Sequence, residues 1–333
     1  MRLLFVVEGF TDIRFVKGLS EIAELTMLVP ARQYRSSGLD KRIAQENLRI
    51  QVDEIPGSRL QYQVRAFSYL WQNATKFDVI LSQEALRGSL NSSIVGALRG
   101  IPVVNYVCIA PVEYFQCRRE RGQNSAFRNW LGTTVIRSLL TINGALATKW
   151  VALGPYLYDL CSRYSKRVKL GYYYGIDTDL YIPLADTCQR RELRRQLNLP
   201  EDKFLIFLSS RISHEKDPET VLQAVAAARK AGLDAAVFNL GGGFQDFLNL
   251  ARQMRLPDAD QWVIGRPAAH PMYDLPRYYQ AADCLAQASL SEGGGMSPLE
   301  ALACGTPAVC TAVGGMAQIL KSHARLTPRR DPE

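Results

Sequence analysis

Apolar runs alternate with segments of helical periodicity along the whole chain. In the first half, the strand-like runs cover residues 3–7, 25–30, 78–82, 102–107 and 150–154. In the second half, they cover residues 204–210, 235–241, 262–265, 283–287, 307–313 and 324–327. Strands that alternate with helices are typical of parallel sheets with helices on both faces. We therefore expect an α/β fold.

The two halves share one local pattern. "SIVGALRGIPVVNY" (93–106) and "PLEALACGTPAVCT" (298–311) each read as a small-residue helix, then Gly-x-Pro, then a β-branched strand. Glycine ends the helix and proline prevents its continuation. A chain of 333 residues also exceeds the usual size of a single core. We predict two similar domains, residues 1–172 and 173–333, with the seam in a Gly-, Asp-, Tyr- and Pro-rich stretch at 171–183.

The last residues resemble the beginning of a helix. Asp331, Pro332 and Glu333 supply an N-cap residue, a proline at the first helical position and an acid in the first turn, but no helix follows. We expect the second domain to be truncated, with its C-terminal helix missing.

A long helix is predicted over residues 127–147, with one apolar stripe: Phe127, Leu131, Val135, Leu139, Ile142 and Leu146. We interpret it as a core helix of the first domain. The alternative is a helix that rests on an anionic membrane, because Trp130 and an arginine cluster (Arg118, Arg119, Arg121 and Arg128) lie within or just before it. No segment approaches the roughly 20 apolar residues of a spanning helix, so we expect a cytoplasmic protein, either free or peripheral on the inner face of the membrane.

The net charge of +8 and a pI of about 9.1 favour anionic partners. No nucleic-acid-binding motif is present, so we expect no nucleic-acid partner. The seven cysteines are odd in number and form no C-x-x-C pair, and the three histidines are scattered. We therefore expect reduced thiols and no metal site.

The stretch "SEGGGMSPLEALACGTPAV" (291–309) places three glycines between Glu292 and a predicted helix. Glycines let the backbone approach a ligand, and amides at a helix N-terminus attract anions such as a diphosphate. A flexible loop is the alternative. Ser297, followed by Pro298 and Glu300, also matches a capping box, in which the Glu300 carboxylate bonds the Ser297 amide.

Two cations follow the strand at 204–210. Arg211 and Lys216 lie in "SSRISHEK", at the carboxyl end of a predicted parallel strand, where open α/β sheets bind ligands. There they could neutralise a phosphate leaving group, and a solvated pair is the alternative. Gly241 and Arg266 end two further strands, but no complete dinucleotide fingerprint accompanies them.

Together these motifs resemble the retaining nucleotide-sugar glycosyltransferases of the GT-B fold, the family 4-like "glycosyl transferases group 1". "SSRISHEK" is similar to that family's Arg-x4-Lys loop, and residues 291–309 are similar to its two-glutamate motif. "TAVGGMAQIL" (311–320) and "YYYGIDTDLYIP" (172–183) resemble its Gly-Gly loop and interdomain stretch. The resemblance implies two Rossmann-like domains that face a cleft, with the acceptor on the side of residues 1–172 and the donor on residues 173–333.

The resemblance also implies residue roles. Arg211, Lys216 and Glu292 would be catalytic: the two cations bind the diphosphate in place of a metal, and Glu292 contacts the donor sugar. Glu300 would hold the ribose. The rest of the donor site would comprise Gly294, Gly295, Met296, Ser297, Gly241 and Arg266. The implied reaction moves a sugar, with retention and without cofactor or metal, to a hydroxyl of a glycan, a polysaccharide precursor or a lipid-linked acceptor.

Some positions depart from the family pattern. No histidine follows the strand at 102–107, so we expect Asn105, Tyr106 or Glu113 to line the acceptor side together with Gly9, which stands alone where relatives have a glycine pair. Tyr174 replaces an asparagine and Gly294 an aromatic residue. These departures leave an alternative: a non-catalytic nucleotide-sugar-binding or scaffold subunit with a degenerate acceptor domain. An NAD-dependent enzyme would need a complete glycine fingerprint, which the sequence lacks.

Overall fold

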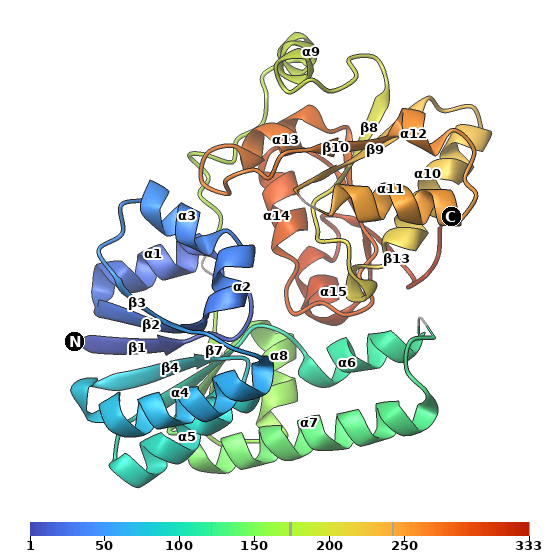
Figure 1. Ribbon diagram of the computed structural model, residues 1–333. Coiled ribbons are helices and arrows are strands. Elements are labelled where there is room, and N and C mark those ends of the chain that lie inside the picture. Colours follow the sequence, from blue (N-terminus) through green and yellow to red (C-terminus); the bar gives the residue numbers. More distant parts are fainter. Residues whose placement is uncertain (121, 173–174, 242, 333) are drawn as a thin grey trace. The chain divides into compact units, whose positions relative to one another are not determined.

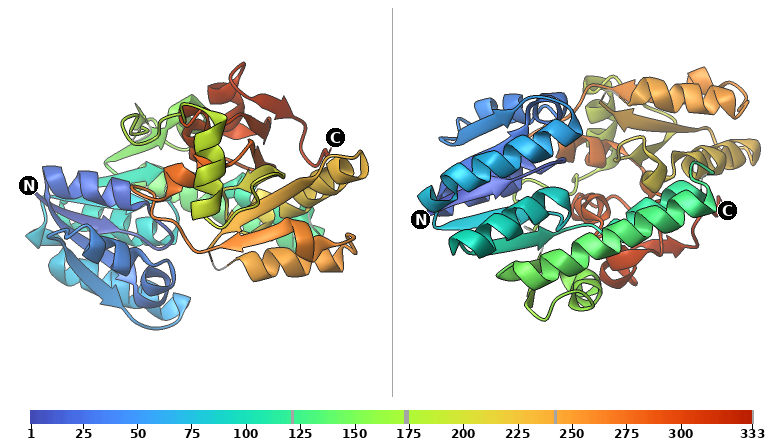
Figure 2. Two further views of the ribbon diagram at one scale, coloured as in Figure 1. Left: turned by 90° about the horizontal axis from the view of Figure 1, so that it is seen from above. Right: turned by 60° about the horizontal axis from the view of Figure 1, so that its bottom comes forward.

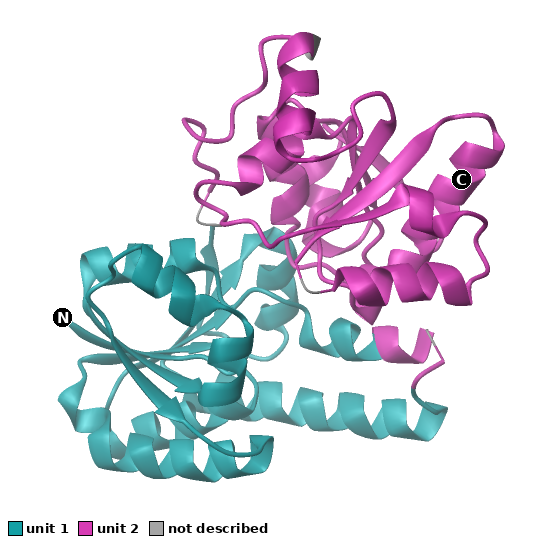
Figure 3. Cartoon of the chain, turned by 45° about the horizontal axis from the view of Figure 1, so that its top comes forward, with its two compact units in different colours: residues 1–116, 124–174 teal, residues 117–123, 175–333 magenta. Residues whose placement is uncertain are grey.

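The computed structural model describes residues 1–120, 122–172, 175–241 and 243–332 (Figure 1). Arg121, Tyr174 and Glu333, named above, lie outside the described residues. The chain divides into two compact units, drawn in different colours in Figure 3: residues 1–116 with 124–174 (unit 1), and residues 117–123 with 175–333 (unit 2). Each unit is built on its own parallel β-sheet, which confirms the predicted α/β fold.

The sheet of unit 1 has the strand order β3-β2-β1-β4-β5-β6-β7, and all its pairs are parallel. Its strands are β1 (Arg2–Val6), β2 (Glu24–Pro30), β3 (Gln51–Ile55), β4 (Val79–Gln83), β5 (Val103–Val107), β6 (Lys149–Leu153) and β7 (Val168–Gly171). Strands β3 and β7 lie outside the apolar runs that predicted the other strands. Both are edge strands, and their polar residues (Asp53 and Glu54, and Lys169) interrupt the apolar run that marks a central strand.

Helices flank this sheet. They are α1 (Ile13–Ile22), α2 (Ala31–Ser36), α3 (Leu39–Gln45), α4 (Arg59–Asn73), the 3-10 turn η1 (Ala74–Lys76), α5 (Arg87–Arg99), α6 (Pro111–Glu120), α7 (Ala126–Leu146) and α8 (Gly154–Ser162). One core cluster joins Leu4, Val6 and Ile80 of the sheet to Tyr62 and Leu70 of α4. Burial of these apolar side chains fixes which face of each strand and helix turns inward.

Helix α7 has the expected bounds but not the expected orientation. Four residues of the predicted stripe, Phe127, Leu131, Val135 and Ile142, are exposed, and Leu139 and Leu146 are half-buried. The buried residues of the helix are Asn129, Thr133, Leu140, Asn143 and Gly144. The inner face packs through small and amide groups: a Cβ on Gly144 would lie 2.1 Å from the Tyr164 carbonyl oxygen. The Asn143 amide donates to the carbonyls of Ala85 and Leu86, at 3.1 Å each. The interpretation of the stripe as a core face is therefore wrong.

The sheet of unit 2 has the parallel order β10-β9-β8-β11-β12-β13. Its strands are β8 (Phe204–Leu208), β9 (Ala235–Leu240), β10 (Val263–Arg266), β11 (Cys284–Gln287), β12 (Ala308–Thr311) and β13 (Arg325–Thr327). Its helices are α9 (Thr187–Gln196), η2 (His214–Lys216), α10 (Pro218–Lys230), α11 (Phe244–Gln253), α12 (Ala259–Trp262), α13 (Leu275–Ala281), α14 (Met296–Ala303) and α15 (Gly314–Leu320). Stacked Phe207 and Phe238, with ring centroids 4.6 Å apart, lie in its core.

The repeated Gly-x-Pro pattern has the structure that the sequence predicts. Gly100 ends α5 and Gly305 follows α14, and both adopt left-handed backbone angles, with φ of 71° and 72°. Strands β5 and β12 begin three residues later. Among the described residues, no helix is both long enough and apolar enough to cross a membrane.

Candidate functional site

Unit 2 has a topological switch point at the carboxyl ends of β8 and β11. The chain passes from β8 outward to β9 and β10, and then returns to the other side of β8 with β11. Loops that leave neighbouring strands in opposite directions open a crevice, which is where ligands bind in open α/β sheets. Arg211 and Lys216 follow β8, and Glu292 and the three glycines follow β11. Both predicted motifs therefore lie at one edge of one sheet.

Lys216 and Glu292 form an ion pair across this edge. The Lys216 ammonium lies 2.5 Å from Glu292 Oε2, which also accepts a hydrogen bond from the Gln287 amide at 3.2 Å. The two loops are tied by the backbone as well, because the Leu290 amide donates to the Glu215 carbonyl at 2.7 Å. Asp217, which has a positive φ of 47°, ends the turn that contains Lys216 and caps α10. The lysine is thus held at the crevice by its neighbours.

Arg211 extends from the same loop. Its guanidinium lies 3.7 Å from Glu215 Oε1, and 54% of its side chain is exposed. Glu215 itself is buried and accepts a hydrogen bond from the Ser213 hydroxyl. An anion that reaches this loop can therefore meet the Arg211 guanidinium. His214 of the same turn is exposed.

Glu300 does not form the predicted capping box. Helix α14 begins at Met296 after Gly295, whose left-handed conformation (φ 73°) starts the helix before Ser297 and Pro298. The Ser297 hydroxyl donates instead to the Ser209 carbonyl at 3.1 Å. The capping-box prediction is wrong because Ser297 already lies inside the helix.

The Glu300 carboxylate belongs instead to a buried hydrogen-bond network. Its Oε2 accepts a hydrogen bond from the Tyr279 hydroxyl at 2.7 Å, and that hydroxyl lies 2.8 Å from Ser209 Oγ. Only 2% of Glu300 is exposed. Burial, and then the Glu300 charge, hold the pKa of Tyr279 well above its usual value. Tyr279 therefore stays a neutral donor toward the carboxylate.

The glycine loop is packed, and this packing explains part of its glycine content. A Cβ on Gly315, in the first turn of α15, would lie 2.0 Å from the Gly293 carbonyl oxygen, and one on Gly295 would lie 3.0 Å from Met316 Sδ. The Gly315 amide donates to the Glu292 carbonyl at 3.3 Å. Helix α14 begins at Met296 without a side-chain hydrogen bond from its N-cap residue, and amides at a helix N-terminus of this kind attract anions.

Gly241 and Arg266 end the two strands beyond β8. Gly241 turns with a φ of 90°, and its amide donates to the Arg266 carbonyl at 2.8 Å. The Arg266 guanidinium donates to the carbonyls of Leu197 and Gly265, and burial lowers its pKa. These bonds tie β10 to the chain just after α9. They give Arg266 a packing role and do not bring its guanidinium to the pair of Lys216 and Glu292.

The expected acceptor-side residues of unit 1 do not converge. Asn105 and Tyr106 lie inside β5, where Asn105 is fully buried and the Tyr106 ring stacks on Phe15 at 4.5 Å. Both side chains are buried within unit 1, and their role on the acceptor side stays a prediction. Glu113 of α6 accepts a hydrogen bond from the Tyr156 hydroxyl, and Gly9 is an exposed residue after β1.

Glu84 and Cys108 occupy the carboxyl edge of unit 1 instead. Glu84 directly follows β4; its Oε1 accepts from the Cys108 thiol at 2.8 Å and from the Gln83 amide at 3.3 Å. Its Oε2 is shielded from solvent and has no hydrogen-bond partner within the described ranges. Burial raises the pKa of Glu84 to about 7. The sequence signal for this group is an acid two residues after the predicted strand at 78–82.

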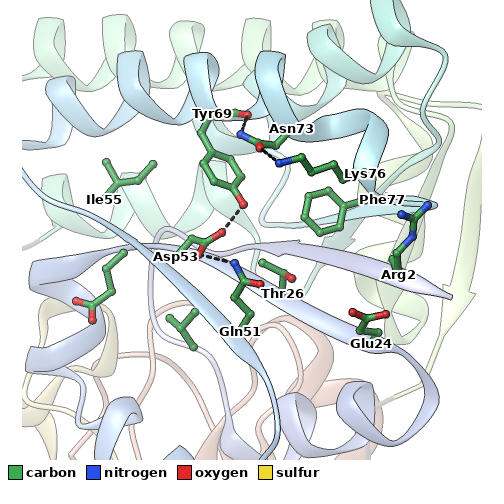
Figure 4. A pocket seen from close by; sticks show the side chains of 12 residues that line it. Arg2, Glu24, Thr26, Gln51, Asp53, Ile55, Tyr69, Asn73, Lys76 and Phe77 are labelled. Carbon is green, nitrogen blue, oxygen red and sulfur yellow. Dashed lines mark hydrogen bonds between the residues drawn. The ribbon is translucent and has the colours of Figure 1, made fainter.

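A cavity of about 700 Å³ in unit 1 lies along β3 and the beginnings of β1 and β2 (Figure 4). It is lined by Arg2, Glu24 and Gln51, which begin β1, β2 and β3, and by residues of α4. Asp53 accepts hydrogen bonds there from the Tyr69 hydroxyl and the Gln51 amide. Cations and acids line it together, so it shows no preference for an anionic substrate. Over the described ranges, no group of three or more His, Cys, Asp and Glu side chains could hold a metal ion.

The second half of the chain matches a known family. Residues 189–333 match the model of the family "Glycosyl transferases group 1". The D-inositol 3-phosphate glycosyltransferase of Arthrobacter sp. (strain FB24) is 32% identical over 150 residues, which cover 44% of this chain and 34% of the relative. The protein of that name from Corynebacterium jeikeium (strain K411) is 34% identical over 148 residues, 43% of this chain and 35% of the relative. The match thus spans about a third of the length of these relatives.

Solved structures resemble the whole chain at low identity. Anabaena Alr3699/HepE in complex with UDP-glucose has a TM-score of 0.77 at 17% identity, covering 100% of this chain and 86% of that one. The sucrose-phosphate synthase of Thermosynechococcus elongatus has a TM-score of 0.70 at 19% identity, covering 100% and 87%. WaaG, a glycosyltransferase involved in lipopolysaccharide biosynthesis, has a TM-score of 0.68 at 14% identity, covering 98% and 86%. The predicted fold, two Rossmann-like units of the GT-B type, is confirmed.

Proposed function

Because residues 189–333 match the model of the family of glycosyl transferases group 1, we propose that this chain transfers a sugar from a nucleoside-diphosphate sugar to a hydroxyl group. The observation that supports this most is the ion pair of Lys216 and Glu292 at the switch point of unit 2, beside the N-terminus of α14. That edge offers cations, backbone amides and a carboxylate within two adjoining loops. A nucleotide sugar presents the complementary groups: a diphosphate and sugar hydroxyls.

Each group has a chemical task in this proposal. Lys216 and Arg211 bind the diphosphate and stabilise the charge that develops on it as the sugar leaves. Preorganised charge of this kind is commonly the largest contribution to catalysis. The amides of Gly294, Gly295 and Met296 bind the same phosphates or the sugar, and Glu292 accepts hydrogen bonds from the sugar hydroxyls. Glu300 accepts hydrogen bonds from the ribose, at the cost of rearranging its bond to Tyr279.

The proposed reaction retains the anomeric configuration and needs no metal. The leaving phosphate accepts the proton of the incoming hydroxyl on the same face of the sugar, so no protein nucleophile is required. Two cations close to the diphosphate supply the positive charge that Mg²⁺ provides elsewhere. UDP-glucose is the first donor to test, because the Anabaena protein with this fold was solved with UDP-glucose and with UDP and glucose.

The acceptor in this proposal is a glycan, a polysaccharide precursor or a lipid-linked sugar. The curated relatives are named for D-inositol 3-phosphate, a hydroxyl-rich acceptor, which supports a polyol acceptor for this chain. We place the protein in the cytoplasm, at the inner face of the membrane where lipid-linked acceptors are available.

A turnover assay tests the proposal. The protein is incubated with UDP-glucose and a panel of polyol and glycan acceptors, with EDTA present, and both UDP release and the anomeric configuration of the product are followed by NMR. We expect acceptor-dependent UDP release that EDTA does not change and an α-linked product. Tight UDP-glucose binding without turnover would contradict transfer and support the non-catalytic binding subunit instead.

A further inference from the structure

Helix α7 presents several large apolar side chains to solvent. We call Phe127, Trp130, Leu131, Val135 and Ile142 the α7 outer face; their exposed fractions range from 44% to 69%. In Figure 2 (right), α7 is the long helix that runs beside α5 in unit 1. Its inner face is fixed by Asn143, whose amide bonds the carbonyls of Ala85 and Leu86 while its oxygen accepts from Ser93. The helix therefore cannot simply rotate to bury the apolar side.

The polar side chains among the α7 outer face are already satisfied. The hydroxyls of Thr134, Ser138 and Thr141 each donate to the backbone carbonyl four residues earlier, at 2.9 to 3.0 Å. A hydroxyl bonded within its own helix loses little when the surrounding water is removed. The face can therefore enter an apolar medium without leaving unpaired donors behind.

The segment that contains this face is strongly positive. Residues 121–170 contain eight Lys and Arg and one acid, Asp159, a net charge of +7 in a chain whose total is +8. No acid occurs between Glu120 and Asp159. Arg128 and Arg137 are exposed on α7, and Lys149, Lys166 and Lys169 are exposed beyond its end. An apolar face flanked by cations is the composition of helices that lie in an anionic membrane surface.

We propose that the α7 outer face docks unit 1 onto an anionic lipid bilayer, with the helix in the plane of the interface. Phe127, Trp130 and Leu131 enter the boundary between headgroups and acyl chains, and the arginines at their flanks meet lipid phosphates. A second copy of this chain would bring a second concentration of positive charge against the first, so charge disfavours self-association. The inference goes beyond sugar transfer and concerns a surface that takes no part in the donor site.

Vesicle flotation tests this surface. The full chain is mixed with vesicles of 70% phosphatidylcholine and 30% phosphatidylglycerol, or of phosphatidylcholine alone, at 0.1 M and 0.5 M NaCl. We expect flotation with the anionic vesicles only, weakened by salt. Phe127→Ala with Trp130→Ala, and separately Arg128→Glu with Arg137→Glu, should each lower the bound fraction about tenfold. The matched control, Leu60→Ala with Val64→Ala, removes apolar groups that are 75% and 65% exposed on α4 and should bind as the parent does.

Three results would overturn the proposal. They are a parent protein that does not float with anionic vesicles, equal loss in the α4 control, and a dimer in light scattering that the Phe127 and Trp130 substitutions disperse. Each variant is also tested for thermal stabilisation by UDP. A variant that no longer floats but is still stabilised by UDP has a defect confined to the α7 outer face. If the proposed donor site is wrong, UDP will not stabilise the protein, but flotation will be unchanged.

Discussion

Lys216 Nζ lies 2.5 Å from Glu292 Oε2, although 76 residues separate the two in the chain. The contact exists because β8 and β11 are adjacent in the sheet, so the loops that follow them meet at one edge. In the proposed function, this pair places the cation where the diphosphate binds and the carboxylate beside the sugar. The proposed donor site is therefore largely preformed in unit 2.

Lys216→Ala should slow transfer more than it weakens donor binding. The positive charge of the lysine matters most as negative charge develops on the departing diphosphate. We therefore expect kcat to fall about a hundredfold and KM for the donor to change less than tenfold. Steady-state kinetics with the active donor measure both constants.

Arg211→Ala should show the same pattern with a smaller effect, because the Arg211 side chain is more exposed. Arg229→Ala, which removes a cation paired with Asp234 at the far end of α10, is the control and should leave kcat unchanged. If Lys216→Ala has the same kcat and KM as the parent, Lys216 does not stabilise the leaving group.

Glu300→Gln should weaken nucleotide binding without unfolding unit 2. The amide keeps an oxygen that accepts from Tyr279 but loses the charge that strengthens hydrogen bonds to the ribose, so we expect the Kd of UDP to rise about tenfold. Calorimetry measures the Kd, and the urea midpoint checks the fold. An unchanged Kd would assign Glu300 to the structure alone.

Gly295→Ala should destabilise unit 2 by about 1–2 kcal/mol. Its φ of 73° disfavours any side chain, and the added Cβ would lie 3.0 Å from Met316 Sδ. Gly9→Ala is the matched control, since no atom lies within 4 Å of the Cβ it adds. Urea unfolding compares the two variants, and equal stabilities would contradict the described geometry of the glycine loop.

Glu84 should make the stability of unit 1 fall as the pH rises. Its pKa is raised from 4.5 to about 7 by burial, so the folded state binds the proton more tightly than the unfolded chain. The resulting loss begins above pH 4.5, is complete above about pH 7, and amounts to about 3 kcal/mol.

Glu84→Gln removes this titration, so the variant should gain stability over the parent between pH 5 and pH 8. Urea unfolding at both pH values measures the difference, with Glu21→Gln on the exposed side of α1 as the control. A parent whose stability is flat over this range would show that Glu84 is not buried as described.

The central strands, the helix-ending glycines and the donor-edge motifs could be predicted from the sequence because their signals are local. Gly100 and Gly305 are each followed two residues later by proline, and Arg211, Lys216 and Glu292 lie in loops that follow apolar runs. Edge strands β3 and β7 were not predicted because each pairs with another strand on one side only. Such a strand tolerates the polar residues that interrupt an apolar run.

The remaining features depend on tertiary contacts. Glu300 has the spacing of a capping box, but its partner is Tyr279, a residue on another helix. The apolar stripe of α7 has the periodicity of a buried helix face. The face that packs against unit 1 is instead the one with Gly144 and Asn143, because larger apolar residues would clash there. Periodicity identifies an amphipathic helix but does not say which of its faces the rest of the fold will cover.

A thermal-shift series tests the central claim, a nucleotide-sugar site in unit 2, most directly. The protein is heated with UDP, GDP, ADP and their glucose or mannose conjugates, each with Mg²⁺ or with EDTA. The account predicts that one nucleotide and its sugar conjugate raise the melting temperature equally with Mg²⁺ and EDTA, and that Glu300→Gln reduces this shift. No shift with any nucleotide, or a shift that EDTA abolishes, would contradict it.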